Sequence, residues 1–344
     1  MRIDQNLAFM LQFENVAWFE DGQVKILDRR IYPREVSYVV CQSYEEVIKA
    51  IQDMVTQSGG PYSAAGMGMV LACFEAQDLS KEEMISWMET AAKKIANARP
   101  TTSTRMKKIV DDAVAIMKES VWSTNEELLE IMQQYAIDEA TARYSSVKEV
   151  GSRLADLIPK DGVVMTQCFA DAVIGFIIER LKETGNTGVS FITPETRPFL
   201  QGARLTASVI QDMGFEVHVI TDNMPAYIMK EKKVDVVTSA ADMITMDGYV
   251  VNKVGTMSLA LLANYYGIPY YCTGTPNLKH ETIETVKIEE RDPSEVMELL
   301  GTKVTMEGVK AYYPAFDITP PSLVSGVVTN KGVYSAFDLK SYFD

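Results

Sequence analysis

The sequence contains only two histidines among its 344 residues, and its four cysteines lie far apart with no CxxC pair. Structural zinc sites take about four closely spaced ligands, mainly from Cys and His, so no metal centre is predicted. There is also no Walker sequence, and no GxGxxG motif follows a predicted strand. These absences argue against the common nucleotide-binding folds. The sequence therefore predicts neither a metal nor a cofactor.

Positive charge is also scarce: 33 Lys and Arg stand against 47 Asp and Glu, which gives a net charge of −14. A general nucleic-acid binder needs clustered Lys and Arg to neutralise phosphates, so this class is excluded. No uncharged apolar run approaches the length of a membrane span, and residues 1–22 carry Asp4, Glu14 and Glu20 and have no long apolar core. We therefore expect no membrane segment, no signal peptide, and a cytoplasmic protein with reduced thiols. A small anionic substrate remains possible if it has a local positive pocket.

The first part of the sequence predicts a small β-structure followed by helices. Residues 7–29 alternate in polarity and contain turn residues, which favours a hairpin or meander. Three serines precede a glutamate by three residues, the spacing of a capping box: Ser43, Ser80 and Ser123. Residues 43–158 are therefore expected to be mostly helical. The glycine-rich stretch QSGGPYSAAGMGM (57–69) is either a tight helix-packing site or a ligand loop, and its composition favours packing.

After residue 160 the pattern changes to short apolar strands separated by helical segments. The strands are GVVMTQ, GVSFIT, FEVHVI, VDVVTSA and IPYYCTG. This βαβ alternation predicts an α/β fold with a parallel, doubly wound, Rossmann-like sheet. We expect two domains. Residues 1–150 form a small, mainly helical N-terminal domain with a β-meander, and residues 151–344 form the Rossmann-like domain.

Two reactive side chains come just after predicted strands. Cys168 follows GVVMTQ, and Asp242 follows VDVVTSA. The carboxyl ends of parallel strands meet at one sheet edge, where ligands bind in this class of fold. Most free cysteines are small buried hydrophobes, and an Asp after a strand is most often a helix cap. The functional interpretation is a proton-transferring pair, with the Cys168 thiolate favoured by a helix N-terminus; without a cofactor, such a pair suits isomerisation.

Several donors are candidates for binding an anion such as phosphate. They are Arg99 and Arg105 in NARPTTSTR, Arg197, Gln201 and Arg204 in TPETRPFLQGARLTA, and Asn252 and Lys253 beyond a further strand. Arginine binds phosphate oxygens in a bidentate manner, and backbone amides at helix starts add to the attraction.

Four stretches of the sequence closely resemble methylthioribose-1-phosphate isomerases. They are ETRPFLQGARLTA, ADMITMDGYVVNKVGTMSLALLANYYGIPYY, IEERDPSEV and GVKAYYPAFDITPPSLVSGVVTNKGV. These enzymes share a superfamily with ribose-1,5-bisphosphate isomerases and with regulatory subunits of the initiation-factor exchange complex. The resemblance implies a helical N-terminal domain, a Rossmann-like C-terminal domain and usually a homodimer. It also implies the interconversion of an aldose 1-phosphate and a ketose 1-phosphate without a cofactor.

The resemblance also implies roles for individual residues. The catalytic pair of the family matches Cys168 and Asp242. Its substrate-contacting residues match Gln201, Asn252, Lys253 and Arg99, and its phosphate-binding loop falls on Ser58, Gly59 and Gly60. A 1-phosphorylated aldose is locked as a cyclic acetal, so we hypothesise that Asp242 donates a proton to the ring oxygen and that Cys168 assists hydrogen transfer between C2 and C1. As a proton donor at neutral pH, Asp242 needs a raised pKa, which burial under a closing domain would supply.

Three departures from the family pattern surround the substrate. Ser58 stands where the family has a phosphate-contacting arginine, CFAD follows where the family usually has Cys-Asn-Thr/Ala-Gly, and TST follows Thr101 in place of Ala-Val-Asn. These changes bear on the identity of the substrate more than on the class of reaction. The alternative is a non-catalytic regulatory protein that senses small phosphorylated ligands. Retention of both Cys168 and Asp242 favours the enzyme.

Overall fold

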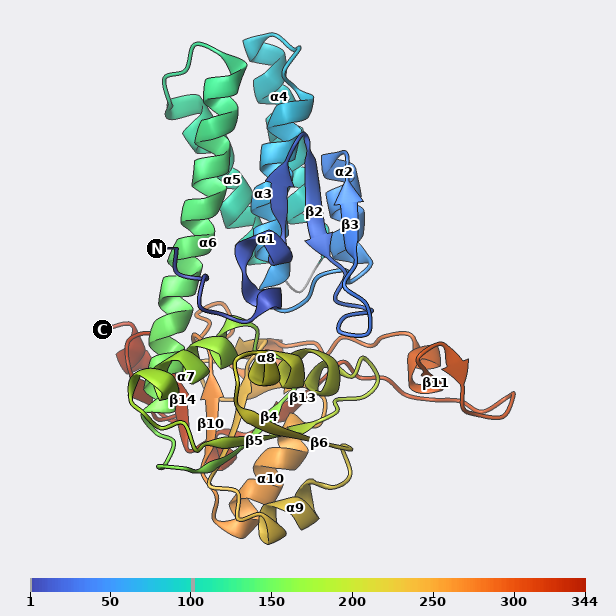
Figure 1. Ribbon diagram of the computed structural model, residues 1–344, viewed down its shortest axis with the longest axis vertical. Helices are drawn as coiled ribbons and strands as arrows, with labels where there is room; N and C mark the ends of the chain where they lie inside the picture. Colours follow the sequence, from blue (N-terminus) through green and yellow to red (C-terminus); the bar gives the residue numbers. More distant parts are fainter. Residues whose placement is uncertain (1, 100–102) are drawn as a thin grey trace. The chain divides into compact units, whose positions relative to one another are not determined.

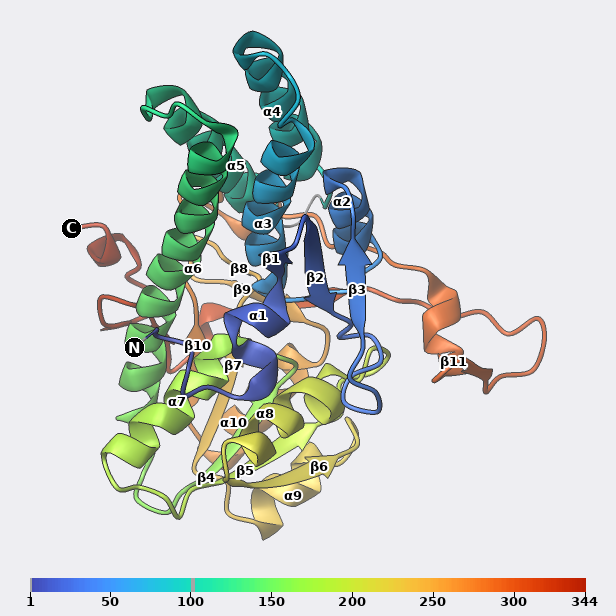
Figure 2. The ribbon, with the colours of Figure 1, turned by 45° about the horizontal axis from the view of Figure 1, so that its top comes forward.

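The computed structural model describes residues 2–99 and 103–344, which form two compact units, Met1–Ser145 and Ser146–Asp344 (Figures 1 and 2). The sequence placed the domain boundary at 150–151. Helix α6 (Asn125–Ala155) is continuous through the boundary between the units. A domain boundary within one regular helix leaves no loop or proline signal in the sequence. In the described ranges no helix is long and apolar enough to cross a membrane.

The first unit begins with short helices and a three-stranded antiparallel meander. The elements are η1 (Phe9–Leu11), α1 (Phe13–Val16), β1 (Trp18–Glu20), β2 (Gln23–Leu27) and β3 (Tyr38–Cys41). The turn between β1 and β2 consists of Asp21 and Gly22, both with positive φ (51° and 73°). Two such residues give the tight hairpin turn whose twist matches that of the strands. The predicted meander is confirmed.

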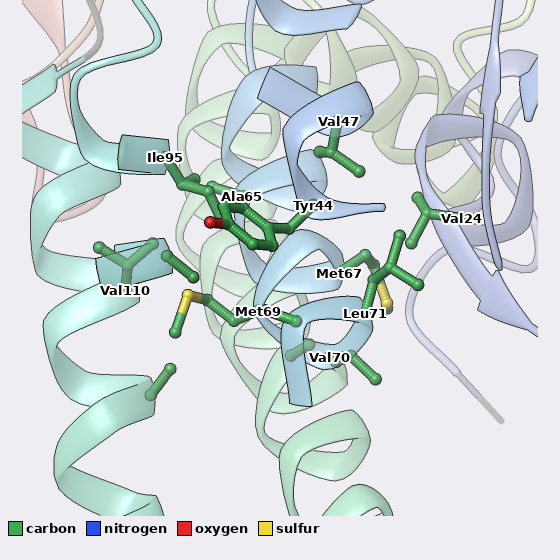
Figure 3. Close-up of a cluster of buried hydrophobic side chains, with 14 of the residues drawn as sticks. Val24, Tyr44, Val47, Ala65, Met67, Met69, Val70, Leu71, Ile95 and Val110 are labelled. Atoms are coloured by element: carbon green, nitrogen blue, oxygen red, sulfur yellow. The ribbon is translucent and has the colours of Figure 1, made fainter. Parts of the chain in front are cut away.

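Four helices besides α6 complete this unit: α2 (Tyr44–Gln52), α3 (Gly60–Glu75), α4 (Lys81–Ala96) and α5 (Ser103–Glu119). Helix α3 lies at the centre, and its apolar residues pack on all sides against Val24, Val47, Ile95 and Val110 (Figure 3). A Cβ added at Gly68 would lie 3.2–3.3 Å from side-chain atoms of Val47 and Ile95. The glycine-rich stretch is therefore a helix-packing site from Gly60 onward.

Two of the three predicted helix caps are confirmed. The Ser43 side chain accepts a hydrogen bond from the backbone of Glu46, and Ser80 forms a complete capping box with Glu83. The third cap lies one residue later than predicted. Thr124 Oγ1, rather than the Ser123 side chain, accepts from Glu127 N at 3.2 Å, while the Glu127 carboxylate accepts from the Ser123 and Thr124 amides. Both hydroxyls have a glutamate at the right spacing, so spacing alone does not distinguish them.

The second unit is built on a seven-stranded sheet in the order β15-β14-β10-β7-β4-β5-β6. The strands are β4 (Val163–Gln167), β5 (Ser190–Pro194), β6 (Glu216–Ile220), β7 (Val236–Ala240), β10 (Tyr270–Thr273), β14 (Gly326–Val328) and β15 (Val333–Tyr334). All neighbours are parallel except β15, which is antiparallel to β14. This confirms the predicted α/β fold.

The helices lie on both faces of this sheet. Helices α7 (Ala172–Glu183) and α8 (Ala207–Asp212) cover one face, and α9 (Pro225–Glu231) and α10 (Thr256–Tyr266) cover the other (Figure 1). From β4 the chain proceeds to β5 and β6 on one side, and from β7 it proceeds to β10 on the other. The strand order therefore reverses between β4 and β7. In open α/β sheets, ligands bind beyond the carboxyl ends of the strands at such a reversal.

A second, three-stranded sheet lies beyond the end of β7. It pairs β8 (Met243–Ile244), β9 (Val250–Lys253) and β13 (Phe316–Thr319), all antiparallel. We call it the small sheet. A hairpin of β11 (Glu298–Leu299) and β12 (Thr302–Lys303) precedes β13 in the chain and projects from this unit (Figure 2). Short helical turns are η3 (Gly202–Thr206), η4 (Ile283–Thr285), η5 (Pro293–Val296), η6 (Pro321–Leu323) and η7 (Lys340–Tyr342).

Candidate active site

Cys168 lies directly after β4, at the reversal of strand order. Its φ is 59°, a left-handed conformation that non-glycine residues seldom adopt and that is common at functional sites. Burial raises the pKa of its thiol to about 11, with a further contribution from the Asp242 carboxylate, although Lys253 opposes the shift. The surroundings therefore favour the neutral thiol and not the thiolate, because helix α7 begins only at Ala172 and desolvation outweighs the nearby cation.

Asp242 lies two residues after β7, the parallel neighbour of β4. Its amide donates to the carbonyl of Val251 at 3.0 Å, which joins it to the small sheet. Cys168 and Asp242 follow two adjacent parallel strands, so the fold places them at the same edge of the sheet, and the Asp242 carboxylate contributes to raising the pKa of the Cys168 thiol. The second unit leaves the Asp242 side chain exposed. The burial expected for a proton donor is therefore not supplied by this unit.

Lys253 is a buried cation at the end of β9, with 5% of its surface exposed. Its ammonium lies 5.0 Å from the centre of the Phe316 ring and 5.9 Å from that of Tyr313. It has no hydrogen-bond partner within the part of the chain that the structure describes. Burial lowers its pKa, and Cys168 and Asp242 oppose this shift. An unpartnered ammonium costs free energy when buried, so this geometry favours a ligand that supplies an acceptor.

Asn252 also lies within β9. The sequence predicts Asn252 and Lys253 beyond a strand, whereas in the structure both are part of β9. The Thr256 hydroxyl donates to the carbonyl of Lys253 at 2.7 Å. Because its single proton is used there, it can only accept from Asn252 Nδ2, at 2.9 Å. This chain of bonds orients the Asn252 amide and fixes the turn between β9 and α10.

Gln201 directly precedes the π-helical segment η3, as its N-cap residue, and is 5% exposed. Its Oε1 is buried and, among the described residues, has no hydrogen-bond donor. The next residue must be glycine, because a Cβ on Gly202 would lie 1.8 Å from the carbonyl oxygen of Pro194. This close approach holds Gln201 at the carboxyl end of β5. The segment is linked to Cys168 by Thr206, whose hydroxyl donates to the Cys168 carbonyl.

Two arginines that the sequence offered for an anion site have structural roles. Arg197 donates to the carbonyls of Val296 (2.9 Å) and Glu298 (2.8 Å), at the base of the β11–β12 hairpin. Arg204 donates from Nε and Nη2 to the carbonyl of Phe199. Both brace the loop that carries Gln201. Backbone carbonyls compete well for guanidinium groups, and a sequence does not show where such carbonyls lie.

The structure adds two residues that the sequence did not indicate individually. Tyr313 is 2% exposed, and the Lys253 ammonium lies 5.9 Å from the centre of its ring. Burial raises the pKa of the Tyr313 hydroxyl, and the Arg291 guanidinium opposes that shift. The Asp317 carboxylate, on β13, accepts from the amides of Gly255 (2.7 Å) and Met257 (3.1 Å). Burial raises the pKa of Asp317 to about 6 against these bonds. Both lie in the GVKAYYPAFDITPP stretch, so the family resemblance was the only feature of the sequence that could have indicated these two residues.

The first unit holds the remaining predicted residues. Ser58 is exposed with φ 57°, Gly59 precedes helix α3 and Gly60 begins it. A Cβ on Gly60 would lie 1.8 Å from Thr56 Oγ1, which explains the glycine. The fully buried Arg29 donates to the Gln57 carbonyl at 2.9 Å and so supports this turn from inside the unit.

The predicted arginines of this unit lie in or near the segment that follows α4. Arg99 is half-buried. Arg105, on α5, lies over the ring of Tyr62 at 5.0 Å, so an aromatic face partly occupies its guanidinium. Thr101 and its neighbours at 100–102 lie outside the described residues.

The assembled groups are suited to proton transfer. The second unit places a neutral thiol, a carboxylate and an ammonium of lowered pKa around the end of β4. A thiol, a carboxyl group and an amine are the kinds of group that transfer protons in general acid–base catalysis, and the buried amide oxygen of Gln201 can accept a hydrogen bond from a hydroxyl of a ligand. Within residues 2–99 and 103–344 no cluster of three His, Cys, Asp or Glu could hold a metal ion.

Comparison with known proteins places the whole chain among related sequences. Residues 60–336 match the profile described as the initiation factor 2 subunit family. Methylthioribose-1-phosphate isomerase 1 of Pseudothermotoga lettingae is 36% identical, covering 90% of this chain and 91% of its own. The methylthioribose-1-phosphate isomerase of Thermotoga maritima is 34% identical, covering 94% and 95%.

Solved structures agree with this placement. The 5-methylthioribose 1-phosphate isomerase of Pyrococcus horikoshii OT3 superimposes with a TM-score of 0.86 at 27% identity, covering 100% of this chain and 99% of that one. The delta subunit of translation initiation factor eIF-2B from A. fulgidus gives 0.82 at 28% identity, covering 93% and 95%.

Proposed function

The chain belongs to the initiation factor 2 subunit family, and on this premise we propose that it is a cofactor-independent aldose–ketose isomerase. Its substrate is an aldose 1-phosphate: methylthioribose 1-phosphate or a related 5-substituted or deoxy pentose 1-phosphate. The observation that carries the proposal is the meeting of Cys168 and Asp242 at the ends of two adjacent parallel strands. A protein that only senses a phosphorylated ligand needs neither group.

The reaction follows from the chemistry of the substrate. A 1-phosphorylated aldose is a locked cyclic acetal, so the ring must be opened before the carbonyl can move. Asp242 protonates the ring oxygen as the C1–O bond breaks. Hydrogen then moves from C2 to C1 with the assistance of Cys168, and the C2 hydroxyl returns its proton to the Asp242 carboxylate as the ketone forms. Atoms and charge balance without an external reactant.

Binding roles follow from the unsatisfied groups. Lys253 supplies a desolvated positive charge for an anionic oxygen, and Gln201 supplies a buried acceptor for a sugar hydroxyl. Asn252 presents an amide already oriented by Thr256. In the first unit, Arg99 and the Ser58, Gly59 and Gly60 turn bind the phosphate, as the family resemblance implies.

The residue at position 58 bears on which sugar phosphate is the substrate. The relatives called methylthioribose-1-phosphate isomerases are about one-third identical to this chain, and the turn lacks the arginine that the resemblance places at 58. If the substrate is the methylthio sugar, the enzyme acts in methionine salvage. We further propose that the protein is a homodimer in solution.

The direct test is a panel of sugars watched by proton NMR for ketose 1-phosphate formation. Methylthioribose 1-phosphate, 5-deoxyribose 1-phosphate and ribose 1-phosphate are each incubated with the wild-type protein and with Cys168→Ser. We expect conversion of at least one of them by the wild type and none above background by the variant. Binding of every sugar without conversion of any would contradict the isomerase.

That outcome would favour the second candidate, a regulatory sugar-phosphate-sensing protein. One structural observation supports it: the fold matches the eIF-2B delta subunit of A. fulgidus almost as well as it matches the isomerase of P. horikoshii. The two candidates share the ligand class and differ only in turnover.

A further inference from the structure

The stretch IEERDPSEV carries part of the family resemblance, yet none of the roles assigned above uses it. In the structure its first half extends the small sheet. Residues 289–291 pair with 313–315 through an antiparallel bridge, and Arg291 N donates to the Tyr313 carbonyl at 3.0 Å. Residue 315 leads directly into β13, which pairs with the strand of Lys253. Arg291 and Lys253 are therefore carried by one sheet.

The Arg291 side chain is held on several sides and is 11% exposed. Its Nε donates to Glu289 Oε1 at 2.8 Å. Its guanidinium carbon lies 5.9 Å from the ring centre of Phe199 and 5.8 Å from that of Phe316. The ammonium of Lys253 lies 5.0 Å from the same Phe316 ring. Two cations thus contact the same aromatic ring.

The positive charges of Arg291 and Lys253, which contact the same ring, influence each other and the groups around them. Arg291 adds to the effect of burial in lowering the pKa of Lys253, and it opposes the effect of burial on the Cys168 thiol. The other charged groups acting on the thiol are Lys253 and Asp242. The titratable groups around Arg291 itself are Glu289, Tyr313 and Glu295. Arg291 is therefore electrostatically linked to two proposed functional residues without being joined to either by a hydrogen bond.

We propose that Arg291 is a positioning residue of the Cys168 site. Its guanidinium, anchored by Glu289 and by two aromatic rings, holds a fixed positive charge opposite Lys253 and eases the release of the thiol proton. The use of that thiol in turnover rests on the isomerase proposal, but the electrostatic link does not. A purely structural role is the competing explanation, since Arg291 also lies on Phe199 in the loop that carries Gln201.

The test measures the alkylation of Cys168 by iodoacetamide as a function of pH, in the free protein and without sugar. Thiolates react and thiols do not, so the profile reports the proton affinity of this sulfur. In Arg291→Gln we expect alkylation at a fixed pH below 10 to be slower by about threefold to tenfold, which corresponds to half to one pKa unit. Arg291→Lys, which keeps the charge, should restore most of the rate. Cys41, Cys73 and Cys272 are buried and serve as internal references in the same mass spectrum.

An alkylation profile unchanged in folded Arg291→Gln would overturn the proposal. If that variant does not fold, Glu289→Gln decides, because it leaves the guanidinium without its counter-charge. Its profile is expected to move the opposite way, toward lower pH, and an unmoved profile would again contradict the proposal.

Turnover separates this inference from the isomerase proposal. With an active wild type, Arg291→Gln should lower kcat and change KM little. If no sugar phosphate is converted by the wild type, the isomerase proposal fails, yet the shifted alkylation profile still establishes the electrostatic role.

Discussion

The two units of the chain differ in the groups that surround their unsatisfied buried polar atoms. In the first unit, buried polar atoms without a hydrogen bond to any described residue include Thr56 Oγ1 and Gln57 Nε2, in the turn before α3. In the second unit they include the ammonium of Lys253 and the amide oxygen of Gln201. Each such atom costs free energy that a ligand can recover. Thr56 and Gln57 precede Ser58 in the chain, and the family resemblance assigns Ser58, Gln201 and Lys253 to the substrate.

The difference agrees with the separate roles that the proposed function gives the two units, which are proton transfer and phosphate recognition. The second unit combines its unsatisfied groups with titratable side chains of shifted pKa: Cys168, Lys253 and Asp317. In the first unit the turn at Ser58 combines backbone amides with the buried guanidinium of Arg29, which donates to the Gln57 carbonyl, and this suits the proposed recognition of a phosphate. The family pattern agrees with this division. The pair that the resemblance assigns to catalysis, in the second unit, is kept, whereas two of the three departures fall in the first unit.

The largest expected effect is the loss of the thiol. Cys168→Ser should fold normally and lose at least about a hundredfold in kcat, the usual scale for removing an acid–base group. The matched control is Cys272→Ser, since Cys272 lies in β10 of the same sheet but is fully buried away from the reversal. It should keep its turnover and lose only stability. Steady-state kinetics and thermal unfolding of both variants check this, and near-wild-type turnover of Cys168→Ser would refute the assignment.

Nearly as large an effect is expected from Asp242→Asn, which keeps the shape of the side chain and removes the acid. Turnover should almost vanish while the sugar phosphate still binds, because the binding groups are elsewhere. Isothermal titration calorimetry and NMR turnover assays on the same sample give both quantities. The control is Asp247→Asn, since Asp247 lies in the β8–β9 turn and accepts from Ile283 N at 3.1 Å. If Asp242→Asn turns over at the normal rate, another residue is the acid.

A smaller effect in the first unit tests its role in recognition. Ser58→Arg should raise kcat/KM for methylthioribose 1-phosphate by about tenfold, as expected for one charge-assisted hydrogen bond to phosphate. Ser58 already has positive φ, so the exchange adds no new backbone strain. Ser58→Ala is the control and should change little. An unchanged or lower constant in Ser58→Arg would mean that the turn holds phosphate without an arginine, or that the pocket takes a different sugar.

Much of the fold was predictable, because strand and helix periods are local signals. Five apolar strands separated by helical segments specify a parallel sheet, and the ends of its strands identify Cys168 and Asp242 as neighbours at one edge. Their placement at one edge follows from the order of the strands alone and needs no knowledge of side-chain packing. The resemblance then narrowed the chemistry.

The small sheet was not predictable in the same way. Its strands are two to four residues long, and β13 lies more than 60 residues after β9. Short antiparallel strands so distant in sequence leave no period to recognise. The positions of Lys253, Arg291, Tyr313 and Asp317 relative to one another therefore became clear only from the pairing. The roles of Arg197 and Arg204 depended on backbone carbonyls that tertiary structure brings to them.

The smallest expected effect concerns Asp317. Its substitution tests how much stability the second unit loses when this buried carboxyl group ionises. Folding raises the pKa of this carboxyl from its ordinary value of 3.8 to about 6, so the folded state binds the proton more tightly than the unfolded state does. This contribution to stability is therefore complete below about pH 4 and is lost as the pH rises through about 6.

The substitution Asp317→Asn tests this pH dependence. Asn cannot ionise, and its Oδ1 still accepts from the Gly255 or Met257 amide. We expect the melting temperature of Asp317→Asn relative to wild type to rise by a few degrees between pH 4 and pH 7. Asp317→Ala, which removes both hydrogen bonds, should be less stable than Asp317→Asn at every pH. A difference between Asp317→Asn and wild type that does not change with pH would show that the carboxyl titrates normally in the folded protein.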